Sequence, residues 1–137
     1  MIVAGRRVFG IPGEPGLARL KTEISGGASA IQQAFGVTPR WYRGATTKYD
    51  AEAMRAIEAM GYRIAGFSVN ADAGATLPRR AIVDRLNAVR DGDVIIAHMN
   101  KPASDSAEGL ATGLDLLVAR SFAFVKLGER NLVHAPG

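Results

Sequence analysis

The 137 residues of this chain include 17 lysines and arginines against 13 aspartates and glutamates, which gives a net charge of +4 at pH 7. A hydrophobic content of 47% excludes a disordered chain, and no apolar run approaches the ~20 residues that a membrane span needs. The basic residues are interleaved with acidic ones and do not form a run with aromatic residues, so nucleic acid is not an expected partner.

The chain has no cysteine, which excludes disulfides and thiolate metal ligands. Its first residues place a basic pair, Arg6 and Arg7, after a very short apolar run, the reverse of the order in a secretory signal. No export signal is therefore visible in this chain. The cytoplasm is the default location, and the actual location stays open.

Apolar residues in the first half of the chain recur at helical spacing. Residues 17–35 predict an amphipathic helix, with Gly36 just past its end. A short aromatic segment follows at residues 40–43. Residues 51–60 predict a second helix, because Asp50 is a favourable N-cap and Gly61 a favourable stop.

The second half of the chain alternates between the same two periods. Residues 62–69 are rich in aromatic and β-branched side chains and predict a strand, and residues 78–90 predict a helix. Residues 92–97 predict the next strand. A helix that carries Leu110, Leu114 and Leu117 follows, capped by Asp105 or Ser106, and residues 122–127 predict a last strand. Residues 128–137 show no pattern.

Strands that alternate with helices indicate βαβ units, and hence an α/β fold whose mainly parallel sheet is covered by helices. We expect a single domain over residues 1–137, which is an ordinary domain length. A doubly wound sheet and a β/α barrel both fit the pattern. Both folds place functional groups at the carboxyl ends of their strands.

Polar side chains follow three of the predicted strands, and we expect them on one rim of the sheet. They are Arg43, Asn70 with Asp72, and His98 with Asn100. An arginine, an aspartate and a histidine together can hold one histidine tautomer and tune a proton donor near neutral pH. Each also has a structural explanation: Asp72 begins a turn in NADAGA, Arg43 is a surface residue, and His98 is a hydrogen-bonded strand end.

The segments GVTPRWYRGATTKYD, GYRIAGFSVNAD, GDVIIAHMNKP and SFAFVKL resemble, in this order, the second part of the NodB-homology polysaccharide deacetylases, carbohydrate esterase family 4. The similarity extends over residues 17–127. Its strongest markers are the order Gly36, Pro39, Tyr42, Arg43 and the position of His98 at the end of an apolar strand. The resemblance implies an incomplete, distorted β/α barrel and hydrolysis of an acetyl group on a carbohydrate or a related small amide.

The resemblance also implies a role for each residue of the rim. His98 matches the general acid that protonates the leaving amine, and Arg43 matches the arginine that orients the catalytic aspartate. Asp72 matches the acidic residue that pairs with this arginine. The usual proline after the arginine is Gly44 here. Substrate contacts are expected from Tyr42, Asn70 and Asn100.

A divalent metal, usually zinc, is implied by the resemblance, but its binding motifs are missing from this sequence. An aspartate pair and a two-histidine motif should precede Leu17, and neither occurs there. The chain has two histidines, and His134 lies in the unpatterned tail, where we expect a surface bystander. We assign no metal ligand, because a zinc site normally takes three protein ligands.

We therefore expect a carboxyl-terminal piece of a deacetylase that is inactive alone and self-associates through an unpaired sheet edge. One alternative is a non-catalytic module of this fold that binds acetylated carbohydrate or serves in assembly. A nucleotide-binding α/β protein is disfavoured, because no glycine-rich phosphate loop follows a predicted strand.

Overall fold

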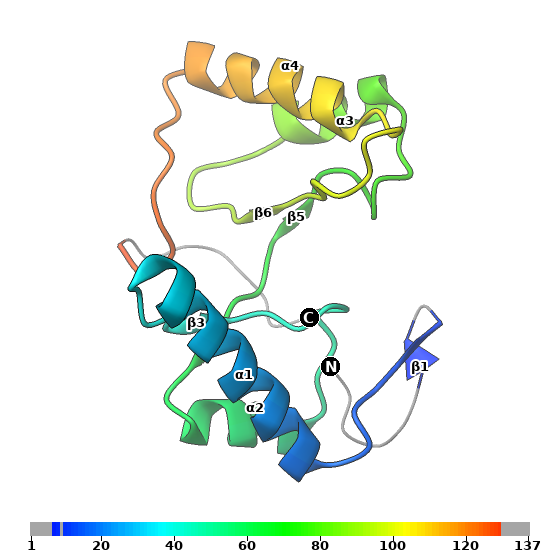
Figure 1. The fold of residues 1–137 in the computed structure, drawn as a ribbon. Helices are drawn as coiled ribbons and strands as arrows, with labels where there is room; N and C mark the ends of the chain where they lie inside the picture. Colours follow the sequence, from blue (N-terminus) through cyan, green and yellow to red (C-terminus); the bar gives the residue numbers. More distant parts are fainter. Residues whose placement is uncertain (1–6, 9, 130–137) are drawn as a thin grey trace. The chain divides into compact units, whose positions relative to one another are not determined.

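The structure is a computed structural model that describes residues 7–8 and 10–129 (Figure 1). The chain divides into two compact units, one up to Gly66 and the other from Phe67 onward, and each is considered by itself. No helix among the described residues combines the length and the apolar character needed to cross a membrane.

The first unit contains two helices and two pairs of short strands. Its elements are β1 (Arg7–Val8), β2 (Ile11–Pro12), α1 (Leu17–Phe35), β3 (Trp41–Tyr42), α2 (Ala51–Ala59) and β4 (Arg63–Ile64). Strands β1 and β2 pair antiparallel, whereas β3 and β4 pair parallel. A core of five buried side chains joins α1 to α2: Leu20, Ile24, Ala53, Ala56 and Ile57.

The ends of both helices follow from local sequence, as predicted. Gly36 ends α1 with φ of 68°, a left-handed conformation that glycine adopts without strain, and its N–H donates to the carbonyl of Gln32. The Asp50 carboxylate accepts the N–H of Ala53 at 2.7 Å and so caps the start of α2.

The second unit contains β5 (Val69–Asn70), α3 (Arg79–Asn87), β6 (Ile95–Ile96) and α4 (Ser106–Ala119). Strands β5 and β6 pair parallel, with Val69 opposite Ile95 and Asn70 opposite Ile96. The core lies between this strand pair and the two helices and consists of Ala71, Ile82, Leu86, Val89 and Leu117.

Helix α4 lies directly against α3 because two of its glycines have no side chain (Figure 1). A Cβ atom at Gly109 would lie 2.8 Å from Cβ of Ile82, and one at Gly113 would lie 2.3 Å from Cδ1 of Leu86. The predicted cap of α4 is wrong in detail. Asp105 stands at the N-cap position, but its carboxylate accepts the N–H of Arg79, at the start of α3, at 2.9 Å.

Two predicted strands differ from the structure. Residues 62–69 do not form one strand, because β4 pairs with β3 and β5 pairs with β6. The predicted strand at 122–127 is wrong: these residues have no strand partner in the described part of the chain. Phe122 packs against the core, whereas Phe124 and Val125 are 58% and 41% exposed, so hydrophobic alternation here does not mark a half-buried sheet.

The α/β class with parallel strands is confirmed. The described strands form three separate two-stranded sheets, and no closed barrel is seen among them. The antiparallel pair of β1 and β2 was not predicted from the sequence. The single domain over residues 1–137 stays a prediction.

Candidate functional site

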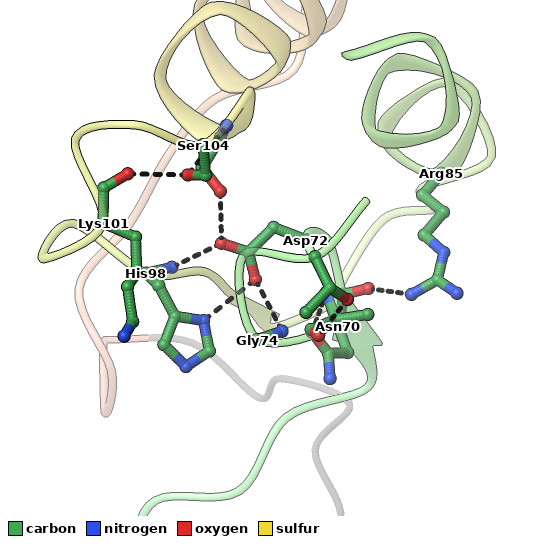
Figure 2. Close-up of polar contacts among 10 residues, drawn as sticks. Asn70, Asp72, Gly74, Arg85, His98, Lys101 and Ser104 are labelled. Carbon is green, nitrogen blue, oxygen red and sulfur yellow. Dashed lines mark hydrogen bonds and ion pairs between the residues drawn. The ribbon is translucent and has the colours of Figure 1, made fainter. Parts of the chain in front are cut away.

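A buried aspartate and a histidine meet where β5 and β6 end. Asn70 lies opposite Ile96, and continuing this register by two residues brings Asp72 level with His98. Oδ1 of Asp72 lies 2.9 Å from Nδ1 of His98, and the backbone N–H of His98 donates to Oδ2 at 2.8 Å (Figure 2). The two side chains, which the sequence analysis places on one rim, therefore lie in direct contact.

Each oxygen of the Asp72 carboxylate accepts two hydrogen bonds. The second bond to Oδ2 comes from the Ser106 hydroxyl at 2.9 Å, and the second to Oδ1 comes from the Gly74 N–H at 3.2 Å. The residue is 0% exposed. Burial alone would raise the pKa of Asp72, but the bonds from His98 and Ser106, with the Ala75 N–H, outweigh it and hold the pKa below its ordinary value.

The ionised carboxylate defines the state of the histidine ring. An ionised carboxylate only accepts hydrogen bonds, so Nδ1 of His98 must carry the proton that lies between the two groups. This leaves Nε2 for other partners. The side chain of His98 is 37% exposed, so its ring contacts solvent as well as the fully buried carboxylate of Asp72.

A strained turn surrounds the carboxylate. Ala73, Gly74 and Ala75 have φ values of 48°, 79° and 62°, and each alanine in this region costs roughly 1 kcal/mol. The turn is held by the Asp72 carbonyl, which accepts the N–H of Thr76, and by the side-chain oxygen of Asn70, which accepts the N–H of Ala73. Asp72 therefore both begins a turn and binds the histidine.

The other two predicted residues of this unit are Asn70, half-buried at the end of β5, and Asn100. The Asn70 carbonyl accepts a bond of 2.6 Å from Nη1 of Arg85 (Figure 2), and Asn100 is exposed in the turn after His98. Sequence reasoning missed Arg85 altogether. It considered Ser106 only as a helix cap, since nothing in the sequence links this residue to Asp72.

A second group of predicted residues lies at the end of β3, in the first unit. Arg43 is exposed, and the N–H of buried Gly44 donates to the Tyr49 hydroxyl at 2.7 Å. A proline at position 44 would lack this N–H. The rings of Tyr42 and Tyr49 meet edge to face at 6.5 Å, and burial, followed by the nearby Tyr49, Glu14 and Glu23, raises the pKa of Tyr42 to about 12.

The predicted residues thus belong to two units. Tyr42 and Arg43 lie in the first, and Asn70, Asp72, His98 and Asn100 lie in the second. The predicted pairing of Asp72 with Arg43 stays a prediction. Within the second unit, the partners of the Asp72 carboxylate include His98, Ser106 and Gly74.

The residues present do not fit a zinc site. Within residues 7–8 and 10–129, no three histidine, cysteine, aspartate or glutamate side chains come close enough to hold a metal ion. A hydrolytic zinc ion takes three protein ligands. His134 lies outside the described residues.

No family model and no curated protein matches this sequence. Among solved structures, the chain is similar to a family 4 carbohydrate esterase from Streptomyces lividans in complex with acetate, with a TM-score of 0.70 and 23% sequence identity. The match covers 82% of this chain and 58% of the esterase, so the chain spans a little over half of that protein's length. The two proteins therefore share a fold.

Proposed function

We propose, from this shared fold, that the chain is part of a deacetylase that hydrolyses an acetyl amide on a carbohydrate or a related small amide. The observation that carries the proposal is the Asp72–His98 pair at the ends of two parallel strands. The esterase of the same fold is in complex with acetate. Acetate is the acid that hydrolysis of an acetyl group releases, which supports this class of substrate.

The chemistry assigns a proton transfer to His98. In amide hydrolysis, the acyl carbon gains a hydroxyl from water, the C–N bond breaks, and the leaving nitrogen takes a proton. Protonated His98 would give this proton from Nε2, because its Nδ1 proton is held by Asp72. Asp72 stays ionised and stabilises the imidazolium. The neutral ring that remains has the tautomer that the carboxylate already favours.

The remaining predicted roles belong to the same proposal. Arg43 orients a catalytic aspartate, and Tyr42, Asn70 and Asn100 contact the substrate. The incomplete β/α barrel and self-association through an unpaired sheet edge are proposed as well, as is the cytoplasm as the default location.

No step is assigned to a metal, because the described residues do not supply a ligand set. We accordingly propose that the 137-residue chain does not turn over an acetyl amide by itself. This observation favours a second candidate: a non-catalytic module that uses the same rim to bind acetylated carbohydrate or serves in assembly.

Binding and turnover by the whole chain test both candidates. The probe is an N-acetylated chito-oligosaccharide, with calorimetry for binding and an acetate assay, with and without added Zn²⁺. His98→Ala is compared with Ser104→Ala, whose hydroxyl donates to the Lys101 carbonyl. We expect saturable binding that only His98→Ala weakens, and no acetate. Acetate release that depends on His98 would establish the hydrolase and refute inactivity alone; neither binding nor release would overturn both candidates.

A further inference from the structure

We propose that Ser106 is a positioning residue for His98 and acts through the carboxylate of Asp72. Its catalytic meaning rests on the proposed function, whereas the contact itself does not. The Ser106 hydroxyl donates to Oδ2 of Asp72 at 2.9 Å, and the other oxygen of the same carboxylate lies 2.9 Å from the histidine ring. The three side chains therefore form one continuous hydrogen-bonded chain.

Ser106 differs from the other donors in where it is anchored. Gly74 belongs to the turn that Asp72 itself begins, so its N–H follows any movement of that residue. Ser106 is the first residue of α4 and is 3% exposed. Its helix is seated on α3 by the close approach of Gly109 and Gly113. The hydroxyl is thus fixed by a different element from the carboxylate that it binds.

This anchoring restricts rotation of the Asp72 carboxylate. With Oδ2 held by Ser106 and by the backbone N–H of His98, Oδ1 is left facing the ring nitrogen. Because Asp72 is fully buried, a surface water does not readily replace a lost hydroxyl. Without Ser106 the carboxylate gains freedom to rotate, and the ring loses part of the acceptor that selects the Nδ1–H tautomer.

The position of the ring proton is therefore the quantity to measure. Nitrogen-15 NMR of the imidazole reports the ratio of Nδ1–H to Nε2–H in the neutral ring at alkaline pH. The substitution His134→Gln leaves His98 as the one histidine in the full-length chain, so its imidazole gives the only such signals. We expect mainly Nδ1–H in this background, and a ratio that falls roughly three- to tenfold in Ser106→Ala, the factor that loss of one ordinary hydrogen bond produces.

Three further variants make the test specific. Ser106→Cys has nearly the same volume but a weak donor, so its ratio should fall as well. Ser106→Thr keeps the hydroxyl and should keep the ratio. The matched control is Thr112→Ala, in the same helix, which removes a hydroxyl that accepts a bond of 3.2 Å from Nη2 of Arg79 and should leave the ratio unchanged.

The proposal is overturned if the Nδ1–H ratio is unchanged in Ser106→Ala, or if Ser106→Thr or Thr112→Ala lowers it equally. Should Ser106→Ala fail to fold by circular dichroism, the Cys variant decides in the same way. Absence of both oligosaccharide binding and acetate release would refute the proposed function and would not change the tautomer ratio. The two failures can therefore be told apart.

Discussion

Asp72→Ala removes the acceptor of four hydrogen bonds at once. Two donors can turn to water: the His98 ring, which is 37% exposed, and the N–H of Gly74, an exposed residue. The Ser106 hydroxyl is buried and has no such alternative, and the backbone N–H of His98 is part-buried. A buried donor without an acceptor costs roughly 1–3 kcal/mol, so we expect the free energy of unfolding to fall by about 2–4 kcal/mol.

Urea unfolding followed by far-ultraviolet circular dichroism measures this loss. The matched control is Asp84→Ala in α3, whose exposed carboxylate lies 4.0 Å from Arg80. A surface pair of this kind contributes little, so the control should change stability by less than about 0.5 kcal/mol. If Asp72→Ala cost less than about 1 kcal/mol, an ordinary value for any point mutation, the carboxylate would not be the centre of the network.

Three further outcomes follow from the described contacts. The pKa of Asp72 lies below its ordinary value of 3.8, so the ionised carboxylate stabilises the folded state fully above that pH and progressively less as the pH falls. Urea titrations should therefore show that the difference in unfolding free energy between the wild type and Asp72→Asn narrows below about pH 4. In thermal melts, Gly113→Ala should lower the unfolding free energy by about 1–3 kcal/mol, because the new Cβ would clash with Leu86. Gly27→Ala, whose Cβ would meet no atom within 4 Å, should raise the unfolding free energy slightly. Absorbance titration of the tyrosines should show a late phase near pH 12 that Tyr42→Phe removes, and a phase that persists in this variant would contradict the assignment.

The helices could be predicted from the sequence because their determinants are local. Hydrophobic spacing and a single cap or stop, such as Asp50 or Gly36, suffice to define a helix and its end. Strands depend on partners that lie far along the chain. Residues 122–127 have the composition of a strand but no neighbouring strand within the described residues. Residues 62–69 divide between two pairings, so composition alone gave the wrong prediction at both places.

The candidate site could be predicted only in part, for the same reason. Asp72 and His98 stand out because both follow apolar segments, and parallel strands bring such ends together. The contact of Ser106 with Asp72 spans 34 positions and depends on how α4 packs on α3. A serine at a helix start predicts a cap, which is a local property, and the structure uses its hydroxyl elsewhere.

The separation of these partners along the chain has a kinetic consequence. The bonds to Asp72 join residues 26 and 34 positions apart, so they form only after two long loops have closed. Until then the carboxylate keeps its water, because removing a charge from water without replacement donors is costly. We expect this network to close late in folding, after the transition state. Loss of these long-range bonds should then accelerate unfolding and leave the folding rate nearly unchanged, so they set the lifetime of the folded unit.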